Sequence, residues 1–409
     1  MIAGLLGIEA LLLIALCVLL VTYRWPSLTK ILWVAFAVRA ASAMFHYFVF
    51  PLPDSGADAK SFEELAWQLA QGGFGNAWAS FTGPGPDLIS WIIALVYSLT
   101  DRSLLLAQAL SVFMGTGTVL FGWLLVRNLW GERVAMKSGW VLVFFPTLVL
   151  YSAIPLREAY IWFFLTLGLL GAVRWSLAGG FAPFFLAMIG FVGATLFHGG
   201  MIIGLLTFGV IVLWRSFKLS LFGLMRSKVR LASMTFVLLA LLTIGGFFVD
   251  IIKVSYLGDF SRVSDLENTV TRIGSYTRSS DLAAYPEWTV PRSPDELLYK
   301  GPIRMGYFLF APFPWDVQKT SHLIGLLDSL LYSFLVFYMW RNRKTIWAHP
   351  AGRLLVLILM SYIFVFGLAV GNFGTGIRHR AKFAVLFIAL VAPFLPRIRL
   401  HRKSSISRY

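Results

Sequence analysis

Charged residues and cysteine are scarce in this chain of 409 residues, and several familiar motifs are missing. Only 13% of the residues are charged, and Cys17 is the single cysteine. One cysteine excludes a disulfide or a cysteine-rich metal site within the chain. The sequence contains no P-loop, no G-x-G-x-x-G and no D-x-D. A cytosolic enzyme that uses nucleotide-activated sugars is therefore not expected.

Hydrophobic residues make up 58% of the chain, and the mean hydropathy is +0.77. They form almost unbroken blocks of about 20 residues, the length needed to cross the hydrocarbon core of a bilayer. The first block lacks a basic leading region and a small-residue cleavage site, so we interpret it as a span. The sequence predicts one all-α polytopic membrane domain over 1–409.

The net charge of +16 comes from short basic clusters between the apolar blocks, and not from one basic surface. Such clusters mark cytoplasmic loops, and a nucleic-acid partner is not predicted. With these loops inside, the chain makes about eleven or twelve crossings, with its N-terminus outside. The eleven spans are predicted near 3–22, 31–51, 104–126, 138–152, 160–178, 181–197, 200–214, 231–251, 321–340, 352–371 and 383–397. The run 87–100 is short, and we expect a half-span there.

The remaining polar segments then share the external side. The two largest are an external loop at 51–86 and a second at 252–305. Charged irregular backbone at membrane depth is stable only where protein or water lines it, which predicts an outward-facing hydrated cavity. Within 51–86, Phe62, Leu65, Ala66 and Leu69 have helical spacing, whereas Glu63, Glu64 and Gln68 fall on other faces. This pattern predicts an amphipathic surface helix, ended by Gly72, Gly73 and Gly75.

Asp58 stands at the start of this helix, and two roles fit it: a helix cap or a catalytic carboxylate. The stretch DAKSFEELAWQLAQG resembles the D-(E)-x-x-(Y/F)-x-x-x-A-x-x-L-x-x-G pattern of GT-C glycosyltransferases, which include protein O-mannosyltransferase-like and aminoarabinose-transferase-like enzymes. Three segments that follow resemble that superfamily and occur in the same order. They are a proline-led apolar run, a helix rich in small residues and a "P…YS" segment. The resemblance implies that Asp58 is catalytic. Ala59 replaces the usual second acid, which puts metal-assisted variants in doubt.

Two further segments carry resemblances. Arg157 is followed by Glu158 and, 41 residues after Arg157, by His198 in FHGG. These residues resemble the "R-(Q/E)…F-H-x-(S/G)" arrangement of bacterial exopolysaccharide and O-antigen polymerases. The run GNFGTGIRHRAKF is similar to the "R-Y-R" stretch that opens the last span of many GT-C enzymes, with His379 at the tyrosine position. Both resemblances imply a polyprenyl phosphate or diphosphate sugar donor in the bilayer, and a glycan, lipid or protein acceptor.

The residue types agree with glycosyl transfer, which needs a base at the nucleophile and cations at the departing phosphate. Asp58 is the candidate base, and Glu158 is a second candidate catalytic carboxylate. Arginine binds phosphate oxygens with a planar fork. The predicted phosphate-binding residues are Arg378, His379, Arg380, Lys382, Arg157, His198 and Arg304. Ion pairing is an equal alternative for Arg157, and packing is one for His198. No metal ligand is predicted, and a divalent metal cofactor is left open.

These observations predict a glycosyltransferase in the bacterial inner membrane that builds a cell-surface glycan at the periplasmic side. A repeat-unit polymerase is the nearest alternative, since it uses the same lipid carrier. A non-enzymatic flippase for lipid-linked sugars is the competing class, although the two related halves common in transporters are not apparent. A structural assembly partner would leave the outward-facing arginines without a role.

Overall fold

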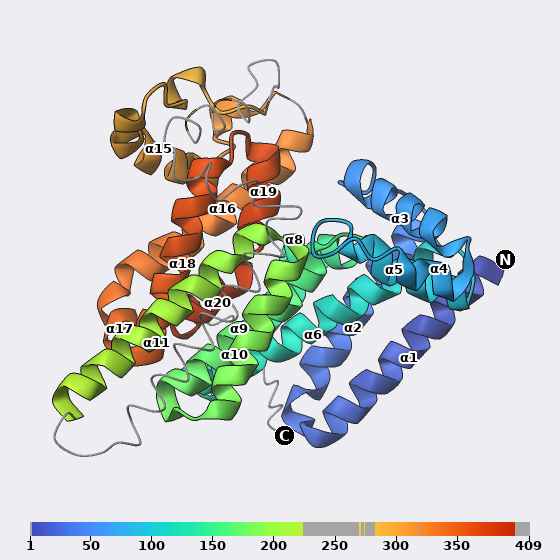
Figure 1. The fold of residues 1–409 in the computed structure, drawn as a ribbon, viewed down its shortest axis with the longest axis horizontal. Coiled ribbons are helices and arrows are strands. Elements are labelled where there is room, and N and C mark those ends of the chain that lie inside the picture. The colour runs from blue at the N-terminus through green and yellow to red at the C-terminus, as the bar shows by residue number, and fades with distance from the viewer. Residues whose placement is uncertain (1, 224–269, 271–273, 275–282, 319, 397–409) are drawn as a thin grey trace, which may run out of the picture.

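The computed structural model describes residues 2–223, 270, 274, 283–318 and 320–396. Within this part the secondary structure is helical apart from an isolated bridge between Ala284 and Asn372. Figure 1 shows a bundle of long helices, with the shorter α3, α15 and α19 toward one end and the short α17 toward the other. The α-helices are α1 (Ile2–Arg24), α2 (Thr29–Phe48), α3 (Ala57–Ala70), α4 (Gly73–Ala79), α5 (Leu88–Leu99), α6 (Leu104–Trp130), α7 (Glu132–Phe144), α8 (Pro146–Ser152), α9 (Glu158–Ala178), α10 (Phe181–Phe197), α11 (Ile202–Gly223), α15 (Leu297–Phe310), α16 (Thr320–Arg341), α17 (Arg343–Ala348), α18 (Pro350–Ala369), α19 (Phe373–Ala381) and α20 (Ala384–Val391).

Seven helices of the described part are long and apolar enough to cross a membrane, or eight if one bent pair is a single span. These dimensions confirm a polytopic all-α membrane protein. The predicted count of eleven is not reached there. The predicted span 138–152 corresponds to α7 plus α8, which are bent by 57°. The helix 181–197 has 17 residues, and the described part of 383–397 holds the short α20 and a 3₁₀ turn. The span 231–251 lies outside the described residues, and the half-span 87–100 corresponds to the 12-residue α5.

A proline breaks the helix between α7 and α8, and an arginine from another helix binds the carbonyl groups that the break leaves without partners. Pro146 has no backbone N–H and disfavours helical geometry at Phe145, which is extended with ψ 118°. The last carbonyl groups of α7 therefore lose their helical partners. The buried Arg39 of α2 donates to two of them, to Leu142 O at 3.2 Å and to Val143 O at 3.4 Å. Hydropathy alone gives no reason for an arginine within this span. In the structure, Arg39 supplies hydrogen bonds to the carbonyl groups of a broken helix inside the bundle.

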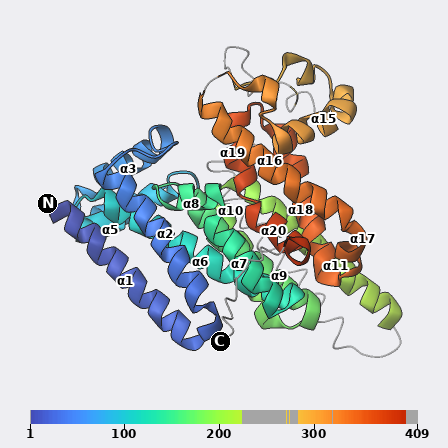
Figure 2. The same ribbon diagram turned by 180° about the vertical axis from the view of Figure 1, so that it is seen from behind.

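The tightest packing joins α9 and α10, which lie side by side in both views (Figures 1 and 2). Glycines line the crossing. A Cβ at Gly190 would overlap the backbone of Gly168, and one at Gly171 would overlap the backbone of Ala187. Lipid tails are as apolar as leucine, so membrane helices gain stability from close backbone approach at small residues. This contact fixes α9, whose first turn carries Glu158.

The surface helix predicted after residue 57 is present as α3, and it packs on α5. Phe62 and Ala66 are buried as expected, but Glu63 is buried as well, contrary to the prediction that it lies on a polar face. Its carboxylate pairs with Arg102 at 2.6 Å and accepts from the Tyr97 hydroxyl at 3.0 Å. A buried carboxylate is stable only with such partners. The glycine run does not simply end the helix, because Gly73, with φ 78°, begins α4.

We expect Gly190→Ala to destabilise the bundle by about 1–3 kcal/mol, because the added methyl group forces α9 and α10 apart. Gly306→Ala is the matched control, since its Cβ would meet nothing within 4 Å. The melting temperatures of the purified proteins in one detergent report the difference. Equal melting temperatures for the two variants would show that the crossing is looser than described.

Candidate functional site

Asp58 is the second residue of α3 and does not cap the helix. The N-cap residue is Gly56, and no side chain caps this end. The Asp58 side chain is 49% exposed. The alternative in which Asp58 only caps α3 is therefore wrong, and its carboxylate is available for an interaction outside the helix.

That interaction is with Arg378 of α19, 320 residues away along the chain. Arg378 Nη1 lies 2.5 Å from Asp58 Oδ2, and Arg378 Nε lies 2.7 Å from Glu158 Oε1. The second Glu158 oxygen accepts from Nη2 at 3.3 Å. One guanidinium therefore joins a surface helix, the first turn of α9 and α19. The sequence analysis proposed all three residues, and the structure brings them together.

The two carboxylates of this triad differ in exposure. Glu158 is 1% exposed and binds Arg378 with both oxygens, whereas Asp58 is half-exposed and uses one. Burial alone would lower the pKa of Arg378, but the charges and hydrogen bonds of Glu158 and Asp58 outweigh it and raise that pKa above its ordinary value. Glu158 thus positions a permanently charged Arg378. Asp58 is the carboxylate that is accessible from outside the protein.

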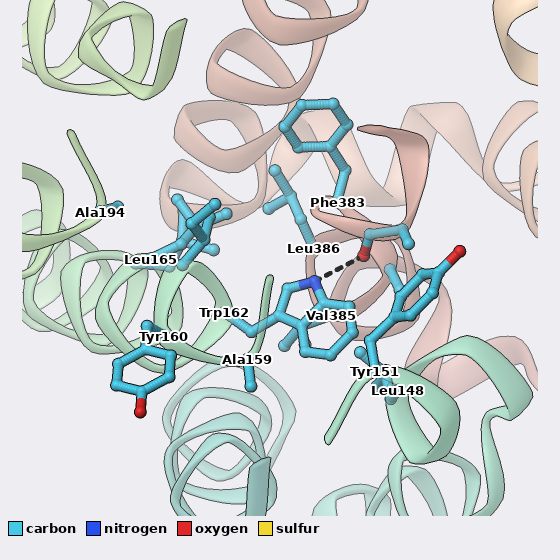
Figure 3. Close-up of a cluster of buried hydrophobic side chains, with 14 of the residues drawn as sticks. Leu148, Tyr151, Ala159, Tyr160, Trp162, Leu165, Ala194, Phe383, Val385 and Leu386 are labelled. Carbon is cyan, nitrogen blue, oxygen red and sulfur yellow. Dashed lines mark hydrogen bonds between the residues drawn. The ribbon is translucent and has the colours of Figure 1, made fainter. Parts of the chain in front are cut away.

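Local packing holds this end of α9 and α19 in place. Trp162 lies one turn after Glu158 on α9, so the two side chains share a face. Its indole donates to the Ala381 carbonyl at 2.8 Å, at the end of α19 (Figure 3). At the other end of α19, the Asn372 side chain accepts from Thr375 N at 2.7 Å. Next to it, Tyr285 N donates to Gly371 O at 2.9 Å, so part of the predicted loop 252–305 reaches the start of α19.

A second group of cations and imidazoles lies beside the triad. Lys382 is buried, and its Nζ lies 2.6 Å from His379 Nδ1. The rings of His379 and His198 are 5.2 Å apart, edge to face. Arg157 is close enough to influence the charge of Glu158, His198 and Lys382. These residues come from the end of α19, the α10–α11 turn and the start of α9, so the structure brings four of the predicted phosphate-binding residues near one another.

Burial lowers the pKa of Lys382 well below its ordinary value. Glu158 opposes this shift, and Arg157 and Arg378 reinforce it. The hydrogen-bond partner of Lys382 is an imidazole nitrogen and not a carboxylate. Its ammonium form thus lacks a directly bonded counter-ion among the described residues, and an anion that entered beside it would supply one.

Arg380 and Arg304 are placed differently from the rest of the predicted phosphate set. Residues two apart on a helix do not face the same way, and Arg380 points away from Arg378 into the protein. It pairs with Asp328 at 2.7 Å and donates to Ala311 O at 2.6 Å. Arg304 is also fully buried, and it donates to the carbonyls of Leu368 at 3.2 Å and Val370 at 2.7 Å. Arg380 braces α19 and Arg304 braces the end of α18, and neither joins the triad.

One residue pair was missing from the sequence analysis. The Tyr151 hydroxyl at the end of α8 donates to Asp54 Oδ2 at 2.8 Å. Asp54 is a non-glycine residue in the left-handed region, with φ 61°. Strained backbone of this kind persists where the surroundings hold it, often at functional sites. The signal in the sequence was the position of Asp54, which lies four residues before Asp58 in the same acidic stretch.

The described residues contain no group of three or more histidine, cysteine or acidic side chains arranged to hold a metal ion. Comparison with known proteins also gives no assignment, because no protein-family model, curated protein or solved structure matches this chain significantly. The site defined by Asp58, Glu158 and Arg378 therefore rests on its own geometry.

We expect Glu158→Gln to lower the free energy of unfolding by about 3 kcal/mol, since it removes the buried counter-ion of Arg378. Asp58→Asn should cost less than about 1 kcal/mol, because that pair is half-exposed. Thermal unfolding of both variants in detergent gives the comparison. A larger loss for Asp58→Asn would contradict the assignment of Glu158 as the positioning carboxylate.

The pKa of Lys382 predicts a pH dependence of stability. The folded pKa lies below the unfolded value near 10.5, so the unfolded chain binds more protons between these values. Stability should therefore rise with pH across that window, and Lys382→Met should flatten the rise. Melting temperatures between about pH 7 and pH 10 test this, with Lys344→Met on the exposed surface of α17 as the control. An unchanged slope in Lys382→Met would show that Lys382 is not the responsible group.

Proposed function

We propose that the protein is an integral-membrane glycosyltransferase that uses a polyprenyl phosphate- or diphosphate-linked sugar donor to build a bacterial cell-surface glycan. The observation that carries this proposal is the position of Arg378, between the buried Glu158 and the exposed Asp58, 2.5 Å from the latter. A base and a phosphate-binding cation then lie side by side in one site. The resemblance of the Asp58 stretch to GT-C enzymes agrees with this pairing.

The proposed chemistry assigns one role to each group. Asp58 removes the proton from an acceptor hydroxyl or amine as that nucleophile bonds to the sugar C1. The bond between C1 and the phosphate oxygen breaks, and the polyprenyl phosphate or diphosphate leaves with the electron pair. Arg378, with Lys382 and Arg157 nearby, stabilises the charge on the departing phosphate. Glu158 touches no reactant and orients Arg378, which refines its predicted role.

The distribution of charge supports an outward-facing site. Arg24 ends α1, Arg127 lies in the last turn of α6 and Arg133 lies in the first turn of α7. These helix ends lie at the end of the bundle opposite α3 and α19 (Figure 1). Excess basic residues beside spans are retained in the cytoplasm. We therefore place the Asp58–Arg378 site at the periplasmic face of the inner membrane, where lipid-linked sugars on that side are accessible.

A repeat-unit polymerase is the second candidate, and one observation favours it. Arg157 and His198, which carry the polymerase resemblance, both lie near Lys382 and His379. A polymerase would use the same leaving group and a longer donor. Incubation of the purified protein with lipid-linked oligosaccharide separates the two candidates, because only a polymerase extends the oligosaccharide in whole repeat units.

The proposed function predicts that Asp58→Asn abolishes transfer while the protein stays folded and present in the membrane. We expect product formation in cells to fall at least about 100-fold, the scale of a lost general base. Glu64→Gln on the same helix is the matched control, since Glu64 is exposed and pairs only loosely with Lys60 at 3.7 Å.

Three outcomes are distinguishable by measuring surface glycan and the sidedness of the lipid-linked precursor. Lost glycan with precursor accumulating on the periplasmic side supports transfer chemistry. Normal glycan removes Asp58 as the base. Precursor trapped on the cytoplasmic side contradicts the enzyme and favours a flippase.

A further inference from the structure

A polar pocket lies at the end of the bundle opposite the Asp58–Arg378 site. Its volume is about 310 Å³, near the lower limit for pockets that hold small ligands. The turn between α1 and α2, the end of α6 and the last turns of α9 form its walls. The lining residues are Trp25, Leu124, Arg127, Asn128 and Arg174.

The pocket carries positive charge from two helices. Arg127 lies on α6, and Arg174 lies on α9. The Arg127 guanidinium stacks over the Trp123 ring at 5.3 Å, which holds it against the wall. The carboxylate of Glu132 approaches Arg127 only to 3.8 Å, with both side chains nearly half-exposed. Among the described residues, no acidic side chain lines the pocket, whereas two arginines do.

The depth of the pocket relative to the bilayer follows from α1. Leu12, Leu16 and Leu20 are more than half-exposed along this helix, as expected for a lipid-facing surface. The apolar run ends at Arg24 and Trp25, and the Arg24 guanidinium lies 6.0 Å from the Trp25 ring centroid. Tryptophan and arginine at the end of a span mark the headgroup level. The pocket therefore opens where lipid phosphates are concentrated.

We propose that this pocket binds the headgroup phosphate of an anionic glycerophospholipid. Paired arginines bind phosphate oxygens with forked hydrogen bonds, and basic pockets between membrane helices favour anionic headgroups. A zwitterionic lipid would place its ammonium group beside two guanidinium groups, which costs affinity. A free phosphate has the same chemistry but lacks the acyl chains that pack on the exposed face of α1. This inference does not depend on the proposed glycosyl transfer.

The first test uses the purified wild-type protein in a neutral detergent. Phosphatidylglycerol, phosphatidylcholine and inorganic phosphate are added separately, and the melting temperature and the lipid retained in native mass spectrometry are recorded. We expect phosphatidylglycerol to be retained and to raise the melting temperature more than the other two. An equal effect of phosphatidylcholine would overturn the charge argument. An equal effect of inorganic phosphate would overturn the lipid argument.

The second test compares Arg127→Gln/Arg174→Gln with Arg343→Gln/Lys344→Gln. The control removes the same two charges from α17, at the same end of the bundle (Figure 1). We expect the pocket variant to lose about tenfold in affinity for phosphatidylglycerol and the control to match the wild type. Equal losses in both variants would show a diffuse electrostatic effect and overturn a specific site. If the pocket variant fails to fold, the wild-type lipid comparison still decides the proposal.

Discussion

The arrangement of the site depends on one guanidinium shared by two carboxylates. Glu158 holds Arg378 from the buried side, and Asp58 holds it from the exposed side. The first contact is within the helical bundle, and the second ties the surface helix α3 to it. A carboxylate on either side keeps the arginine charged in a partly buried place, where an unpaired charge would be costly. A substrate phosphate would compete with Asp58 for the same fork, and displacing it would free a base beside the reacting group.

The other buried arginines bind backbone carbonyl groups at the ends of interrupted helices. Arg39 donates hydrogen bonds to carbonyl groups at the break between α7 and α8, and Arg304 donates to those at the end of α18. Arg380 donates to the Ala311 carbonyl in the segment after α15 and pairs with Asp328. Interrupted helices in a membrane protein leave backbone groups that water cannot reach. Guanidinium groups with several donors satisfy them, and the breaks allow helices such as α19 to form the site.

Charge is organised differently at the two ends of the bundle. Around Arg378, acids and cations are interleaved, and the geometry favours the exchange of one anion for another. At the opposite end, Arg127 and Arg174 have little acidic compensation in the described residues, which suits the retention of a bound anion. The proposed enzyme would thus meet a lipid-linked substrate at one face and structural lipid at the other.

Hydropathy was sufficient to predict the membrane class and most long helices, because the cost of placing each residue in hydrocarbon depends mainly on its own side chain. The sequence also indicated that Asp58, Glu158 and Arg378 lie on the same side of the membrane, where charged side chains need partners of opposite charge. Tertiary structure alone decided that Glu63 is buried against Arg102 and that Arg380 turns inward while Arg378 turns to the site. These outcomes depend on helix phase and on contacts between distant segments, which no local pattern of residues encodes.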